Sequence, residues 1–121
     1  MNHVQLETEL LKAARTLTKQ IEEYREHGQE YAATKREYAI ALSKKLLELA
    51  DAGRPATLSD QLAKGDEGVA DARQRKDVAF ALWRAAVEHI HVLQTQVDIA
   101  RSLFPWEREE RFENPIPGGE F

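Results

Sequence analysis

The chain has 121 residues, of which 42% are apolar and 31% are charged, and its net charge at neutral pH is −4. This length fits one domain, and the absence of cysteine excludes disulfides and thiolate chemistry. Basic residues are interspersed with acidic ones instead of forming a stripe, which disfavours direct binding of DNA or RNA. The N-terminus shows no signal peptide and no apolar run is long enough to span a bilayer, so we expect a cytoplasmic protein.

The first predicted element is a long helix over residues 4–52. Tyr24, Tyr31 and Tyr38 stand seven residues apart in it, and no proline interrupts the stretch. A seven-residue repeat returns to one stripe of a helix, which is typical of a helix packed lengthwise against a partner helix. Gly28 costs about 1 kcal/mol relative to alanine inside a helix, so it is either a point of close contact or a weak spot. The two predicted stripes are Leu17, Tyr24, Tyr31, Tyr38 and Lys45, and Ala14, Ile21, Gly28, Lys35, Leu42 and Leu49.

The connection that follows contains several turn and capping signals. Gly53 is placed to end the first helix, because glycine is favoured just past a helix C-terminus. A short helix over residues 58–64 should then cover the end of a hairpin. Thr57 and Asp60 have the spacing of a capping box for this short helix, with Asp in place of the usual Glu or Gln. Asp66 is a suitable N-cap for the next helix.

A second long helix is predicted over residues 67–104, and it should end where Pro105 removes a backbone donor. Its heptad stripes complement those of the first helix, because small side chains in one helix leave room for rings in the other. The small row comprises Ala72, Ala79, Ala86, Leu93 and Ala100. The large row comprises Lys76, Trp83, Ile90, Val97 and Phe104.

These elements predict an all-α fold, in which residues 1–104 form a long antiparallel two-helix coiled-coil hairpin with a short capping helix in the connection. An extended C-terminal tail should follow over residues 105–121. A symmetric turn would place Tyr31 near Ala86 and Ile90, and Leu17 near Ala100. The predicted core is therefore a seam of tyrosine rings against alanine methyl groups.

A second apolar row lies on the second helix outside these stripes, and it comprises Val78, Leu82, Ala85, Val92, Ile99 and Leu103. A hairpin covers only one stripe per helix, and an apolar patch of this extent is unusual on a monomer. Either the C-terminal tail folds back over the row, or chains associate into a three- or four-helix bundle. We favour a homodimer, because a two-helix core is thin for independent stability. The predicted interface residues are Val78, Leu82, Val92, Ile99 and Leu103.

The tail over residues 105–121 is acidic, with five glutamates against two arginines. Two prolines and two glycines among its last seven residues predict an extended conformation. Its apolar residues could anchor it in a groove of a partner protein; these are Trp106, Phe112, Ile116 and Phe121. The alternative is a tail that packs on its own hairpin or has no fixed structure.

We predict neither a metal site nor another cofactor. His27 and Glu30 on the first helix would lie level with Glu88 and His91 on the second, and Glu-x-x-His is the ligand spacing of di-iron carboxylate bundles. Such sites need inward-pointing ligands from four helices, whereas these four residues flank the seam. We predict no catalytic residues either, because the sequence has no phosphate-binding glycine loop, nucleophile elbow or evident carboxylate cleft.

The order of a long helix, the turn Gly53-Arg54-Pro55-Ala56-Thr57-Leu58, the segment Ala63-Lys64-Gly65-Asp66 and an alanine-rich helix resembles small uncharacterised helical proteins of bacteriophages and prophages. The resemblance covers residues 20–104 and implies an accessory role in an infected bacterial cell. The sequence predicts a non-enzymatic protein–protein interaction module, either an adaptor or a structural accessory protein. The alternatives are an inhibitor of a host nucleic-acid-handling or defence complex that acts through acidic surfaces, and a helical metal-binding protein.

Overall fold

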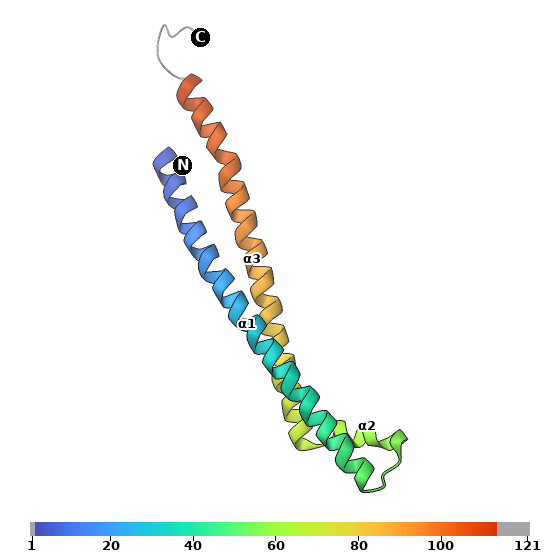
Figure 1. The fold of residues 1–121 in the computed structure, drawn as a ribbon. Helices are drawn as coiled ribbons and strands as arrows, with labels where there is room; N and C mark the ends of the chain where they lie inside the picture. Colours follow the sequence, from blue (N-terminus) through green and yellow to red (C-terminus); the bar gives the residue numbers. More distant parts are fainter. Residues whose placement is uncertain (1, 114–121) are drawn as a thin grey trace. The chain divides into compact units, whose positions relative to one another are not determined.

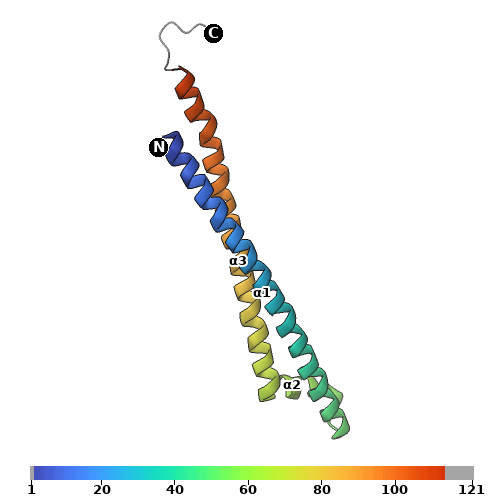
Figure 2. The ribbon, with the colours of Figure 1, turned by 60° about the vertical axis from the view of Figure 1, so that its left-hand side comes forward.

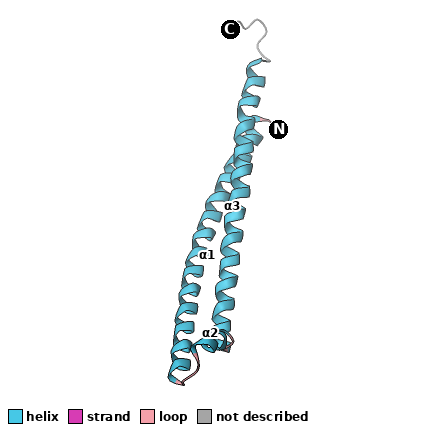
Figure 3. Cartoon of the chain, turned by 90° about the vertical axis from the view of Figure 1, so that its right-hand side faces the viewer, coloured by secondary structure: helices cyan, strands magenta, loops and turns pink. Residues whose placement is uncertain are grey.

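The computed structural model describes residues 2–113, with side chains as far as Leu103. It contains three helices: α1 spans His3–Asp51, α2 spans Ala56–Lys64 and α3 spans Glu67–Glu113 (Figure 1). No strand occurs in this part of the chain (Figure 3). α1 packs against α3 and α2 lies in the connection, so the predicted all-α hairpin is confirmed.

The start of α1 is fixed by a reciprocal pair of hydrogen bonds between Asn2 and Gln5. The backbone N–H of Gln5 donates to Oδ1 of Asn2 over 2.8 Å, and the backbone N–H of Asn2 donates to Oε1 of Gln5 over 3.1 Å. This capping box satisfies two N–H groups that have no partner inside the helix. The helix therefore begins at His3, close to the predicted start.

The end of α1 is a Schellman motif at Gly53, as the sequence predicts. Gly53 has a φ of 74°, a left-handed conformation that glycine adopts without a steric penalty. The N–H of Arg54 donates to the carbonyl of Leu49, and the N–H of Gly53 donates to the carbonyl of Ala50, each over 3.0 Å. These two bonds satisfy terminal carbonyl groups, and the chain leaves the helix axis at this point.

The short helix α2 is confirmed, but its start and its capping differ from the prediction. It begins at Ala56, earlier than expected, and its N-cap is Pro55 with a φ of −59° and a ψ of 136°. No side chain caps it, so the predicted capping box of Thr57 and Asp60 is wrong. Asp60 instead pairs with Lys64 one turn later, with 3.0 Å between Oδ2 and Nζ. The restricted φ of proline is compatible with the position just before a helix, so α2 can begin directly after Pro55.

The start of α3 agrees with the prediction, and its end does not. Asp66 is the N-cap, because its Oδ2 accepts a hydrogen bond from the N–H of Val69 over 3.2 Å. At the other end α3 continues to Glu113, whereas the prediction ended it at Phe104 and began an extended tail at Pro105. A proline inside a helix removes one i→i−4 hydrogen bond and is accommodated by local bending, so it does not by itself end the helix.

The packed helices divide into two compact units. The 23–86 unit contains residues 23–86, and the terminal unit contains residues 2–22 and 87–113 of the described chain. Within each unit a segment of α1 runs antiparallel beside a segment of α3 (Figures 1 and 2). α2 belongs to the 23–86 unit.

The two predicted stripes of α3 form its contact with α1. The buried members of the small row are Ala72, Ala79, Ala86 and Leu93. The members of the large row are half-buried or buried, namely Lys76, Trp83, Ile90 and Val97. The heptad period of α3 was therefore predicted correctly over the part whose side chains are described.

The tyrosine stripe of α1 is half-buried as predicted, and so are Gly28, Leu42 and Leu49 of the predicted companion stripe, but the positions one residue earlier are covered along more of the helix. Lys35 and Ile21, two members of the predicted companion stripe, are exposed, whereas Thr34 is only 4% exposed. The buried or half-buried positions of this observed companion stripe are Leu6, Ala13, Gln20, His27, Thr34 and Ala41. Three of these six residues are polar, so a search for apolar heptads does not find the stripe.

The register between the helices also differs from the prediction. In the 23–86 unit the ring of Tyr31 stacks on Trp83, with centroids 5.5 Å apart, instead of meeting Ala86. The offset arises in the connection: Nζ of Lys45 lies 3.4 Å from Oδ1 of Asp66, the residue just before α3. The last turns of α1 therefore extend beyond the start of α3, and α2 spans the return. The prediction had assumed a symmetric turn.

The terminal unit has an offset of its own. Leu6, which is 2% exposed, borders a groove together with Ala100 and Leu103. The prediction had placed Leu17 beside Ala100. Leu6 is thus the buried apolar side chain that α1 places beside this part of α3.

Candidate interaction surface

An aromatic cluster of Tyr24, Tyr31, Phe80 and Trp83 fills the space between α1 and α3 in the 23–86 unit. Its ring centroids are 6.1 Å apart for Tyr24 and Trp83, 5.1 Å for Tyr31 and Phe80, and 6.2 Å for Phe80 and Trp83. These separations are typical of favourable ring packing. A Cβ at Gly28 would come within 3.2 Å of Nε1 of Trp83, so Gly28 is a point of close contact. The tyrosine stripe is therefore part of the core and not an exposed binding ridge.

Three charged residues, called the charged clasp below, connect the end of α1 with the start of α3, and these are Lys45, Glu48 and Asp66. Nζ of Lys45 lies 3.4 Å from Oδ1 of Asp66 and 3.4 Å from Oε2 of Glu48. The hydrogen bond from the N–H of Val69 lowers the pKa of Asp66, and the bond to Lys45 lowers it further. The hydrogen bond to Asp66 in turn raises the pKa of Lys45. This clasp is a structural device at a helix terminus, where an acidic cap also interacts favourably with the helix dipole.

His27, Glu30, Glu88 and His91, the four residues with metal-ligand spacing, do not come together as one group in the described part of the chain. There, no group of three or more His, Asp or Glu side chains is arranged to hold a metal ion. His27 is half-buried in the companion stripe, whereas Glu30, Glu88 and His91 are exposed. Glu30 lines a groove that His27, Glu88 and His91 do not line.

The predicted anchors of the tail fall where side chains are not described. Trp106 and Phe112 lie in the helical part of α3, instead of in an extended tail. Ile116 and Phe121 lie outside the described residues. Docking of the tail onto a partner, and with it the inhibitor that acts through the tail, therefore stays a prediction.

The second apolar row is exposed on α3, as its position outside the two contact stripes predicts. The exposed fractions are 52% for Val78, 48% for Leu82, 54% for Val92, 56% for Ile99 and 45% for Leu103. These side chains are half uncovered although neighbouring positions on the same helix are buried. An apolar row of this length on a helix surface is typical of a protein interface.

Two polar residues that sequence reasoning had not assigned to this row complete its heptad pattern. His89 and Gln96 are exposed and stand at the two missing positions. The full set, called the second seam below, is Val78, Leu82, Ala85, His89, Val92, Gln96, Ile99 and Leu103, with alternate spacings of four and three. Each member precedes a residue of the small or large row by one position, so the second seam is rotated by about 100° from the contact with α1. The alternate spacing was the signal that could have revealed His89 and Gln96.

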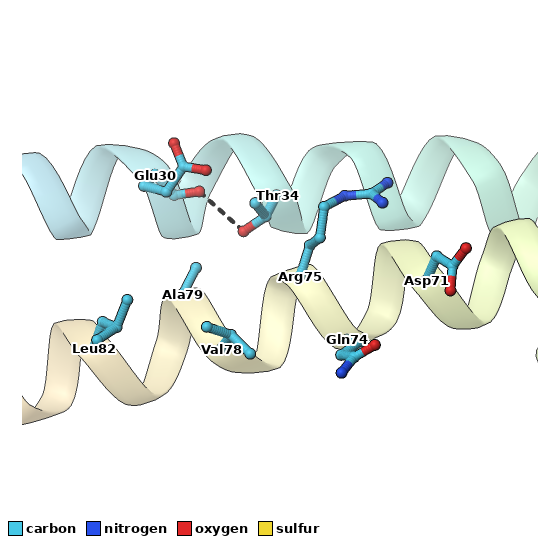
Figure 4. A pocket seen from close by; sticks show the side chains of 8 residues that line it. All are labelled: Glu30, Thr34, Asp71, Gln74, Arg75, Val78, Ala79 and Leu82. Carbon is cyan, nitrogen blue, oxygen red and sulfur yellow. Dashed lines mark hydrogen bonds between the residues drawn. The ribbon is translucent and has the colours of Figure 1, made fainter.

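In the 23–86 unit the second seam borders a groove between α1 and α3 with a volume of about 410 Å³. Figure 4 shows Val78, Ala79 and Leu82 on α3 along one side and Glu30 and Thr34 on α1 along the other. The hydroxyl of Thr34 donates to the carbonyl of Glu30 over 2.9 Å, which satisfies this buried polar group within its own helix. The groove therefore combines three apolar side chains of α3 with polar and charged neighbours, because Asp71, Gln74 and Arg75 of α3 line it as well.

The terminal unit has a comparable groove of about 450 Å³. It is lined by Ile99, Ala100 and Leu103 from α3 and by Leu6 and Glu9 from α1, together with a glutamine from each helix. In each unit, therefore, members of the second seam line the α3 side of a groove and α1 supplies the other side. This repetition makes the face that carries the second seam the candidate interaction surface.

Comparisons with known proteins found no matching family model, no matching curated protein and no matching solved structure. Searching the described residues for a membrane-crossing helix gave none of sufficient length and apolar character.

Proposed function

We propose that this chain is a non-catalytic helical module that binds another protein helix along the second seam. The observation that supports the proposal is the exposure of apolar side chains at heptad spacing on α3. In a regular helix such positions form one stripe, and a stripe of this kind packs knobs into holes against a second helix. The accessory role in a phage-infected cell, implied by the resemblance of the turn and helices, belongs to this proposal and rests on that resemblance alone.

The magnitude of the exposed area indicates what kind of partner is needed. Fully burying a Val, Leu or Ile side chain is worth about 1.5–3 kcal/mol, and the five large members of the second seam are already about half buried. Covering the remainder contributes about 1 kcal/mol each, or roughly 5 kcal/mol for one side of the interface. Association costs about 4–15 kcal/mol, so a stable complex requires a partner that brings an apolar stripe of its own.

A photo-crosslinking experiment tests the proposal. A photoreactive amino acid is introduced at Val92, in the second seam, and separately at Gln94, an exposed residue far around the helix from the seam. Each variant is produced in the source organism and irradiated. We expect intermolecular adducts from Val92 and few from Gln94. Equal adduct formation at both positions, or none at Val92, contradicts the proposed function.

A further inference from the structure

We propose that the groove of the 23–86 unit binds a basic amphipathic helix of another protein, one whose apolar stripe is flanked by lysine or arginine. This inference rests on the proposed function and adds the chemistry of the partner. It uses residues of the 23–86 unit alone. The apolar side chains of the groove, the free carboxylates beside them and the pairing of the nearby cations support it.

The apolar part of the groove is a strip on α3 that the 23–86 unit leaves uncovered. Val78, Ala79 and Leu82 form this strip, and the side chains of Val78 and Leu82 are each about half exposed. On the α1 side, Thr34 is only 4% exposed, and its hydroxyl lies within hydrogen-bond distance of the carbonyls of Glu30 and Tyr31. A partner therefore has to bring apolar side chains to the strip, but no polar group for Thr34.

The α1 edge of the groove is acidic. Glu23, Glu30 and Glu37 stand seven residues apart and so share one stripe of the helix, and Glu26 lies one turn before Glu30. Glu30 lines the groove from this edge, and Asp71 lines it from α3. In the described part of the chain neither Glu30 nor Asp71 has an ion-pair partner. Both carboxylates are therefore available to a cation of an incoming helix.

The cations that border the groove are already paired. Arg75 extends from α3 toward α1 (Figure 4), where its Nε lies 3.8 Å from Oε2 of Glu37. Lys64 and Arg73 line a neighbouring groove that also contains Val78, and each pairs with an aspartate four residues away, over 3.0 Å and 3.9 Å. The charge left without a partner is therefore negative, and charge complementarity favours a basic helix.

The same charge disfavours the occupants that the chain itself offers. The C-terminal segment over residues 105–121 has five glutamates against two arginines, so its charge has the sign of the groove. A second copy that met this groove with its own would set two negative faces against each other, and like charges across an interface are costly. In contrast, basic residues beside a heptad stripe can reach acidic residues of the facing helices, as in coiled-coil pairs.

Designed peptides test the inference on the full chain. Two helical peptides of about three heptads carry the same leucine stripe, with lysine at the flanking positions in one and glutamate in the other. Fluorescence anisotropy gives the Kd of each labelled peptide. We expect the lysine-flanked peptide to bind at least about tenfold more tightly, and we expect added salt to reduce this advantage by screening. Equal affinities, or no binding of the lysine-flanked peptide at about 1 mM, overturn the inference.

Two double variants locate the binding. Glu30→Gln with Asp71→Asn removes two carboxylates from the groove. Asp51→Asn with Asp98→Asn is the matched control, because it removes the same charge from exposed positions that line neither groove. All four residues are exposed, so both variants should keep their helix content, which circular dichroism verifies.

The groove variant should weaken binding of the lysine-flanked peptide about fivefold, and the control variant should weaken it less than about twofold. An equal loss in both means that only the net charge of the chain attracts the peptide, and it overturns the inference.

Two further outcomes separate this inference from the proposed function. If the chain does not discriminate between the peptides while the photoreactive group at Val92 captures a protein, the inference fails and the proposed function stands. If neither experiment reports a contact, both fail. Sedimentation of the chain alone completes the test: a dimer that Leu82→Gln dissociates means that a second copy occupies the groove, and it overturns the basic partner.

Discussion

Removal of the Trp83 side chain should destabilise the protein more than any other single truncation in the 23–86 unit. Trp83 lies within 6.1 Å of Tyr24 and 5.5 Å of Tyr31, measured between ring centroids, and covers Gly28. Truncating a buried tryptophan to alanine costs about 3–5 kcal/mol. Trp83 is half-buried, so about half of this value applies, together with part of the ring-pair energy of about 0.5–1.5 kcal/mol. We expect Trp83→Ala to lower the free energy of unfolding by about 2–3 kcal/mol.

The assay is urea unfolding followed by circular dichroism, with thermal unfolding as a second measure. A loss of about 2–3 kcal/mol should lower the Tm by roughly 8–12 °C in a chain of this size. Trp83→Phe is the matched control, because it retains a ring against the tyrosines and should cost only about 1 kcal/mol. If Trp83→Ala costs less than about 1 kcal/mol, or if phenylalanine is as harmful as alanine, the rings do not hold the two helices together as described.

Two further predictions concern Gly28 and the charged clasp. Gly28→Ala should be nearly neutral, because a gain of about 1 kcal/mol in helix propensity is offset by crowding at Nε1 of Trp83, 3.2 Å away. In the Trp83→Ala background the gain should appear in full in urea unfolding, and equal effects in both backgrounds would contradict the contact. The folded-state pKa of Asp66 lies below its ordinary 3.8, so its contribution to stability is present above that value and is lost as the pH falls through the folded-state pKa. Asp66→Asn keeps a capping oxygen but does not titrate. The unfolding midpoints of the natural protein and of this variant, measured from about pH 6 to pH 2, should therefore converge as the pH falls. A difference between the midpoints that stays constant with pH refutes the role of the charge.

Local signals along the chain predicted the helices well. The heptads of α3, the glycine after α1 and the aspartate before α3 each act within a few residues of the backbone that they shape. The second apolar row could also be recognised from the sequence, because the exposed and the buried positions of one regular helix have the same heptad spacing and differ only in their direction around the helix axis. These features required no knowledge of how the helices meet.

The register and the companion stripe of α1 could not be predicted in the same way. The register depends on the direction in which α2 leaves Pro55, and on the pairing of Lys45 with Asp66, and neither is encoded in a periodic pattern. The companion stripe includes Gln20, His27 and Thr34, whose polar side chains conceal it from a hydrophobicity search. The end of α3 was misplaced because a proline weakens a helix locally without deciding whether the next turn forms.

No large side chain in the described part of the chain is completely shielded from water, and the fully buried positions are mostly alanine and other small residues. If the second seam binds another helix as proposed, the bound partner adds to the stability of this chain by mass action. The resistance of the chain to proteases should then rise with the concentration of that partner.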